Sequence, residues 1–161
     1  MPNEKINRCS KLLASKEWRI GFAESATAGR LSYEFSLAPD SGKILVGGIV
    51  CYDASIKTGI LGIPEEFVER FTPESAEVTK AMADAIYEAH PTEVCVAITG
   101  LTTPGGSESE EKPVGTMFIH VIFPGYSVAD RIVFKGSPEE IVGQTVDRVA
   151  ELVMEGISKA D

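Results

Sequence analysis

Three short segments of the sequence combine residue types that could bind or hydrolyse a small polar molecule. The first runs from Glu24 to Gly29 and contains Ser25 and Thr27, directly before a predicted helix. Hydroxyl groups and the N–H groups at the start of a helix can hold a phosphate or a developing oxyanion. The same pattern also occurs in ordinary capping turns, so both interpretations stay open.

The second segment combines an aromatic residue with a lysine. Tyr52 ends a predicted strand, and Lys57 follows about one turn into the next predicted helix. A lysine whose pKa is lowered by burial can accept the proton of a serine hydroxyl, so Lys57 is a candidate general base. The alternative is a solvated lysine, which is the usual state on a short helix.

The third segment is a loop that follows the predicted strand ending at Thr99. It begins with Gly100 and contains Gly106, and it leads into an acidic stretch. The loop lacks the Gly-Lys-Ser/Thr ending of a P-loop and does not match a dinucleotide fingerprint. Because surface loops are often rich in Gly and Pro, its composition alone indicates a binding site only weakly.

Length and charge limit the classes of partner. The 161 residues fit one domain, 1–161, with a single well-covered core. The formal net charge of −9 makes the chain as a whole repel phosphate backbones and anionic membrane surfaces. We therefore expect a small-molecule partner, and neither nucleic acid nor a membrane.

Cysteine and histidine usage predicts a reducing compartment and no metal. Cys51 and Cys95 lie in apolar strand-like runs, and the odd count of three cysteines favours free thiols. His90 and His120 have no second ligand at metal-binding spacing. We therefore expect no bound metal. Because no apolar leader or spanning stretch is visible, we also expect a cytoplasmic location.

Hydrophobic periodicity predicts helices that alternate with buried strands. Strands are expected at 18–23, 44–52, 94–99, 115–123 and 128–134, and helices at 6–15, 30–37, 54–61, 64–70, 73–89 and from Ser137 to about Gly156. Thr72 is the predicted N-cap of the fifth helix, with Pro73 at its first position. The fold class that follows is α/β, with helices on both faces of a mixed, mostly parallel sheet of about five strands.

Taken together, the motifs resemble the CinA C-terminal domain family, whose members hydrolyse the amide of nicotinamide mononucleotide. The matching stretches are Ala23-Glu24-Ser25-x-Thr27-x-Gly29, Gly47-Gly48-x-Val50-x-Tyr52-x4-Lys57-x3-Leu61-Gly62, Ile98-Thr99-Gly100-x3-Pro104-x-Gly106 and Glu111-Lys112-Pro113-Val114-Gly115-Thr116. They follow the family's order and spacing over nearly the whole chain.

The resemblance implies a three-layer α/β/α fold and a hydrolase that needs neither metal nor cofactor. It implies a serine nucleophile activated by Lys57, with Tyr52 lining the site, and a place in the pyridine nucleotide cycle and NAD salvage. The substrate-binding residues that it implies are Glu24, Ser25, Thr27, Gly29, Thr99, Gly100 and Gly106. The family's habit of self-association implies a homo-oligomer.

Two positions depart from the family pattern. The family's usual nucleophile falls on Gly42, so Ser41 becomes the catalytic candidate if the turn shifts by one residue. A family arginine in the last helix aligns near Val142 or Gly143, and Arg148 stands at least a turn further on. Three readings compete: a deamidase using Ser41 or Ser25, a hydrolase of another small amide or nucleotide, and a non-catalytic module that binds nucleotides or other partners.

Overall fold

The computed structural model describes residues 3–161 and contains five strands and seven helices within that range. The strands are β1 (Ile20–Glu24), β2 (Leu45–Val50), β3 (Val94–Gly100), β4 (Thr116–Phe123) and β5 (Tyr126–Val133). The helices are α1 (Glu4–Ser15), α2 (Arg30–Ser36), α3 (Ser41–Ile44), α4 (Ala54–Gly59), α5 (Glu65–Phe71), α6 (Ala76–Ala89) and α7 (Pro138–Lys159).

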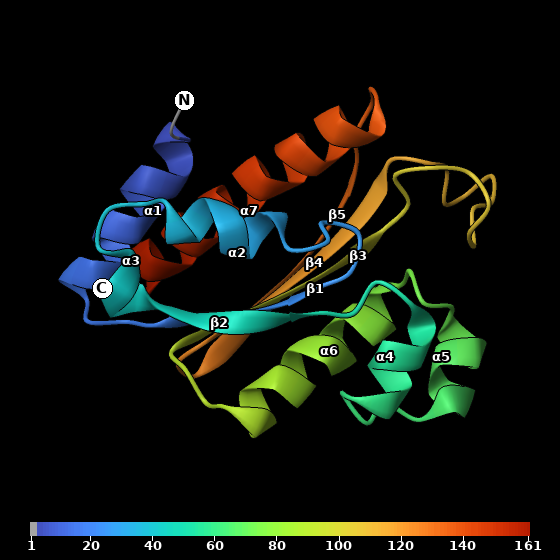
Figure 1. The fold of residues 1–161 in the computed structure, drawn as a ribbon, viewed down its shortest axis with the longest axis horizontal. Helices are drawn as coiled ribbons and strands as arrows, with labels where there is room; N and C mark the ends of the chain where they lie inside the picture. Colours follow the sequence, from blue (N-terminus) through green and yellow to red (C-terminus); the bar gives the residue numbers. More distant parts are fainter. Residues whose placement is uncertain (1–2) are drawn as a thin grey trace.

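All five strands form one mixed sheet in the order β2-β1-β3-β4-β5. β1 pairs in parallel with both β2 and β3, whereas β4 is antiparallel to its two neighbours. In Figure 1, α1, α2 and α7 cover one face of the sheet and α4, α5 and α6 lie on the other. The predicted three-layer α/β fold with a mixed sheet is confirmed.

Strand burial explains the layers. Along β3, Val94, Val96 and Ile98 join the core under α1, α2 and α7. The alternate residues Cys95 and Ala97 join the core under α6, because successive side chains of a strand point to opposite faces. The edge strand β5 alternates half-buried and exposed residues instead, since one of its faces is left to solvent.

Several predicted boundaries are wrong for local reasons. The N-cap of α6 is Ser75, whose hydroxyl accepts the N–H of Val78, and not Thr72. Thr72 instead has a φ of 70°, which turns the chain between α5 and α6. The predicted turn at Ser41 is the short helix α3, and the β4–β5 hairpin has only Pro124 and Gly125 between its strands.

The parallel strands β1, β2 and β3 end at the same edge of the sheet, where ligands of open α/β sheets usually bind. Close packing at this edge requires glycine at position 100, because a Cβ there would lie 2.2 Å from Met117 Sδ and 2.7 Å from the Thr116 carbonyl oxygen. Within residues 3–161, no helix has both the length and the apolar content to cross a membrane.

Candidate active site

Lys57 is buried at the carboxyl edge of the sheet, with only 1% of its surface exposed. Asp53 caps α4 by accepting the N–H of Ser55, and this short helix carries Lys57 back under the end of β2. The Lys57 Nζ lies 3.0 Å from Ser25 Oγ and 2.9 Å from the Cys51 carbonyl oxygen. The sequence marks Lys57 as a candidate general base after this strand. The structure encloses its amine against Ser25, and Lys57 does not itself line the cavity beside Ser25.

Burial lowers the pKa of Lys57 from 10.5, because the charged ammonium loses its hydration. Two backbone carbonyls, those of Cys51 and Tyr52, accept hydrogen bonds from the amine. A neutral amine has two N–H donors and one lone pair. In the structure the amine also donates to Ser25 Oγ, and loss of that proton leaves the lone pair facing the hydroxyl, which is the geometry a general base needs.

A tight turn after β1 fixes Ser25. Its N–H donates to the Ile98 carbonyl at 3.0 Å, which ties the turn to β3, and its carbonyl accepts the N–H of Ala28. Ala28 and Gly29 both have positive φ values, 47° and 93°, so the chain reverses sharply before α2. Ser25 is 6% exposed, and its hydroxyl lies between the buried Lys57 and the cavity that Ser25 lines.

A cavity of about 220 Å³ opens beside Ser25. Its lining combines Ser25, Ala26 and Tyr52 with Glu74 and the loop residues Gly100, Leu101, Thr102, Thr103, Pro104, Gly105 and Gly106. Tyr52 is 62% exposed there, so its ring is available to a ligand. Of the predicted binding residues, Ser25, Gly100 and Gly106 therefore meet at this cavity, together with Tyr52.

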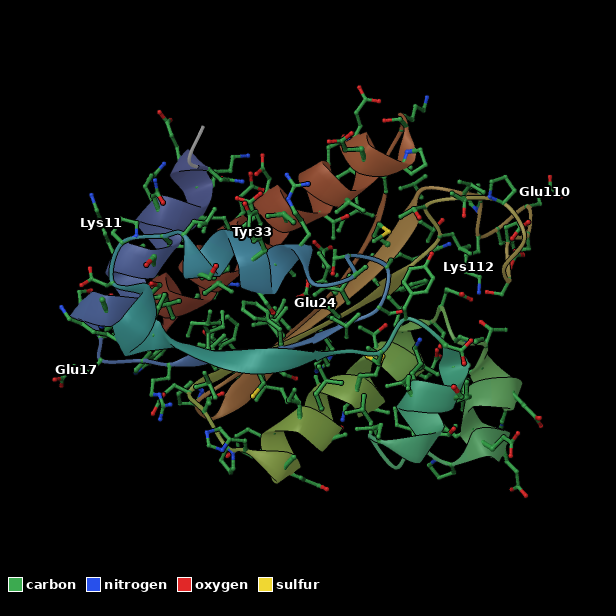
Figure 2. All side chains as sticks on the ribbon, viewed as in Figure 1. Lys11, Glu17, Glu24, Tyr33, Glu110 and Lys112 are labelled. Atoms are coloured by element: carbon green, nitrogen blue, oxygen red, sulfur yellow. The ribbon has the colours of Figure 1, made fainter. Side chains whose placement is uncertain are left out.

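Glu24 and Thr27 contact other parts of the chain instead. The buried Glu24 carboxylate accepts the N–H groups of Leu31 and Ser32, at 2.8 and 3.1 Å, and the Thr27 hydroxyl at 2.8 Å. Figure 2 shows Glu24 between α2 and the sheet. The start of α2, for which the sequence left an anion site and an ordinary capping turn both open, is thus occupied by an internal carboxylate. Gly29 is the N-cap residue of α2.

Thr99 also contacts the scaffold. Its fully buried hydroxyl lies 2.8 Å from the hydroxyl of Thr79 on α6, which in turn donates to the Ser75 carbonyl. The pair links β3 to the first turn of α6. Neither Thr99 nor Glu24 is part of the cavity lining.

A family comparison decides the identity of this fold. The model of the CinA C-terminal domain matches residues 3–157. The chain belongs to the CinA C-terminal domain family. A CinA-like protein of Desulfotalea psychrophila is 36% identical over 129 residues, covering 80% of this chain and 31% of the relative. A putative competence-damage inducible protein of Moorella thermoacetica is 34% identical over 142 residues, covering 88% and 34%.

The chain thus spans about a third of the length of these curated relatives. Among solved structures, a CinA superfamily protein from Klebsiella pneumoniae has a TM-score of 0.90 at 25% identity, with 97% of both chains covered. One from Enterobacter cloacae has a TM-score of 0.83 at 28% identity, covering 97% of this chain and 92% of its own. The CinA fold therefore extends over almost all of the chain.

Within this CinA fold, Ser41 lies far from Lys57. Ser41 begins α3 at the amino end of β2, whereas Lys57 follows the carboxyl end of the same strand. β2 has six residues, which corresponds to roughly 20 Å of extended chain. A Cβ at Gly42 would meet nothing within 4 Å, so no steric conflict explains the glycine there.

No arginine stands at Val142 or Gly143, the positions where the family resemblance aligns one. Val142 and Gly143 occupy the second turn of α7, and Arg148 lies further along the same helix. Arg148 pairs with Asp130 of β5 at 2.7 Å and with two glutamates of α7. It serves as a link between α7 and the sheet.

Three residues near the cavity were missed by the sequence analysis: Glu74, Ser107 and Lys112. The Lys112 Nζ donates to the Thr72 hydroxyl, the Glu74 carbonyl and the Ser107 hydroxyl at 2.7 to 2.8 Å, and Ser107 donates to the Glu74 carboxylate. Figure 2 shows Lys112 on the inner side of the long loop and Glu110 at its outer end. A lone lysine next to Pro113 in an acidic stretch was the available signal.

Proposed function

We propose that this protein hydrolyses the carboxamide of nicotinamide mononucleotide to the carboxylate and ammonia, with Ser25 as nucleophile and Lys57 as general base. The contact of 3.0 Å between the buried Lys57 Nζ and Ser25 Oγ supports this most directly. Family membership supports the reaction class. The reaction fits a role in pyridine nucleotide salvage in the cytoplasm, where the three buried free thiols would stay reduced.

The chemistry follows from the positions of the side chains. Ser25 Oγ attacks the carboxamide carbon while its proton moves to Lys57 Nζ. The backbone N–H of Ala26, the next residue and part of the cavity lining, is the donor we assign to the oxyanion. Lys57 then returns the proton to the departing nitrogen as the C–N bond breaks and ammonia leaves.

Water completes the cycle. It attacks the acyl ester on Ser25 and gives one proton to Lys57 Nζ. The ester bond breaks, Lys57 returns that proton to Ser25 Oγ, and the carboxylic acid loses its own proton to solvent or to the released ammonia and leaves as the carboxylate. Lys57 suits both transfers because burial lowers its pKa below 10.5, which favours the neutral amine that a base requires.

The deciding experiment is ammonia release from the mononucleotide by the purified chain and its serine variants. Loss of the nucleophile in Ser25→Ala should reduce kcat by about 10³-fold or more, since the hydroxyl that forms the acyl ester is gone. Ser41→Ala should retain turnover, because Ser41 lies at the opposite edge of the sheet. The reverse pattern would restore Ser41 as the nucleophile.

A non-catalytic binding module is the second candidate, favoured by Gly42 and by the vacant arginine position in α7. For that candidate, the unaltered chain releases no ammonia above background while calorimetry still detects the mononucleotide. Hydrolysis of a different small amide with no turnover of the mononucleotide would instead support a changed substrate. In both cases the Ser25 variant distinguishes binding from chemistry.

A further inference from the structure

Glu74 brings a carboxylate to the cavity beside Ser25. Among the described residues that line this cavity, Glu74 alone carries a charge. Its Oε2 accepts the hydroxyl of Ser107. Its Oε1 is directed to the Gly106 side of the cavity, where a Cβ on Gly106 would lie 3.5 Å from it.

This carboxylate is held in place without a direct ion pair. The Lys112 ammonium lies 2.7 Å from Ser107 Oγ, and Ser107 lies between it and the Glu74 carboxylate. The Glu74 carboxylate also acts on Lys57, whose pKa it raises against the larger lowering by burial. A fixed, partly shielded carboxylate favours a cationic ligand.

Tyr52 also favours a cationic ligand in this cavity. Its side chain is 62% exposed and lines the same cavity. The face of an aromatic ring attracts cations, and flat cationic rings stack on it. A carboxylate and an exposed aromatic ring are together suited to a planar aromatic cation.

We propose that Glu74, with Tyr52, selects substrates whose carboxamide is carried on a positively charged aromatic ring. This proposal rests on the proposed function. It means that the site prefers N-substituted pyridinium carboxamides to neutral amides of the same shape. The ring nitrogen of such a compound is quaternary, so the charge is present at every pH. Glu74 is thus a specificity-determining residue that takes no part in proton transfer.

The test compares nicotinamide mononucleotide with its dihydropyridine form, which keeps the carboxamide, ribose and phosphate but has a neutral ring. Calorimetry in a Ser25→Ala background prevents consumption of the ligand. We expect the cationic form to bind about tenfold more tightly, as a partly exposed charge pair allows. Glu74→Gln should remove that ratio by weakening only the cationic form.

Two control variants separate charge from shape. Glu77→Gln removes a carboxylate in the first turn of α6, outside the cavity lining, and should keep the tenfold ratio. Ser107→Ala removes the hydrogen bond to Glu74 while leaving its charge, and should keep a preference for the cation. Equal losses for both ligand forms in Glu74→Gln, or no binding of either form to the parent chain, would overturn the assignment.

The proposed function and this inference fail separately. A chain that releases ammonia but shows the same ligand ratio in Glu74→Gln retains the amidohydrolase and loses the role of Glu74. A chain without turnover whose cation preference disappears in Glu74→Gln loses the amidohydrolase and retains the role of Glu74.

Discussion

Lys57 and Lys112 lie at the same edge of the sheet and share one physical feature, since burial lowers the pKa of both. Their surroundings differ. Lys57 contacts a serine hydroxyl and two backbone carbonyls, and its ammonium is almost fully enclosed. Lys112 is half-buried and donates to Thr72, Ser107 and the carbonyl of Glu74, with the Glu74 carboxylate close by.

These surroundings suit Lys57 to the proposed role of general base and Lys112 to a structural role. The hydrogen-bond partners of Lys57 are all neutral, and burial lowers its pKa more than the Glu74 carboxylate raises it, which suits the proposed proton exchange with Ser25. A lysine with three acceptors and a nearby carboxylate is better used as a permanent cation that joins two segments. Lys112 connects the loop after β3 to the chain between α5 and α6, and so fixes one wall of the cavity.

The largest expected effect is the loss of kcat when the Lys57 amine is removed, and removal of the Lys112 amine gives the comparison. Lys57→Met should reduce kcat by about 10³-fold or more, and Lys57→Met combined with Ser25→Ala should cost little beyond either change alone, because the two groups act as a unit. Lys112→Met should mainly raise KM by loosening the cavity wall. Steady-state kinetics of these four variants and the unaltered chain measures both effects, and a kcat loss in Lys112→Met equal to that in Lys57→Met would remove the distinction.

The free energy of unfolding should depend more on Lys112 than on Lys57, which is the reverse of the order expected for kcat. Loss of its three hydrogen bonds in Lys112→Met should lower the free energy of unfolding by about 1–3 kcal/mol. Lys57→Met should cost less, or even stabilise the fold, because a buried amine is replaced by an apolar chain of similar length. Urea unfolding compares the two variants, and a larger loss for Lys57→Met would show that its contacts are structural.

The pH dependence of turnover sharpens the comparison further. Only neutral Lys57 can accept the Ser25 proton, so kcat/KM should rise with pH through the Lys57 pKa, which burial holds below 10.5. Lys112→Met should leave that ascending limb in place. A limb that moves with Lys112, or one centred at the ordinary lysine pKa, would assign the titration to another group.

The smallest expected effect concerns His120, a third buried base, on β4. Both of its ring nitrogens lack a hydrogen-bond partner among the described residues, and burial lowers its pKa from 6.5, with Lys80 adding to the shift. The unfolded chain then binds a proton more readily, so stability should fall as pH drops below 6.5. His120→Leu should remove this loss and stabilise the fold by about 1 kcal/mol in unfolding at pH 5.

Local sequence patterns determined the elements and the sheet class. Buried apolar runs separated by helical spacing predicted all five strands, because that pattern needs only nearest neighbours along the chain. The predicted start of the last helix at Ser137 is correct, and in the structure Ser137 forms a capping box with Glu140 there. Thr72 and Pro73 predicted the start of α6 wrongly, because the positive φ of Thr72 depends on how α5 and α6 pack.

The residue types of the candidate site were visible in the sequence, and their partners were not. Ser25 and Lys57 could be selected as hydroxyl and base, but their contact depends on α4 folding back beneath the end of β1. The family resemblance implies that Glu24 binds substrate, whereas in the structure its carboxylate caps α2. The family resemblance made Ser41 the candidate nucleophile for Lys57. Within the chain, the length of β2 holds these two residues apart.

Sequence alone therefore determined the fold class and the residue types of the candidate site, since both follow from short-range patterns. The tertiary structure decided which hydroxyl faces the lysine, which carboxylate faces the cavity, and which lysine joins the loop to the helices. Each of these depends on contacts between residues distant in the chain, such as Lys112 and Thr72, and only the packing of strands and helices brings such residues within hydrogen-bonding distance.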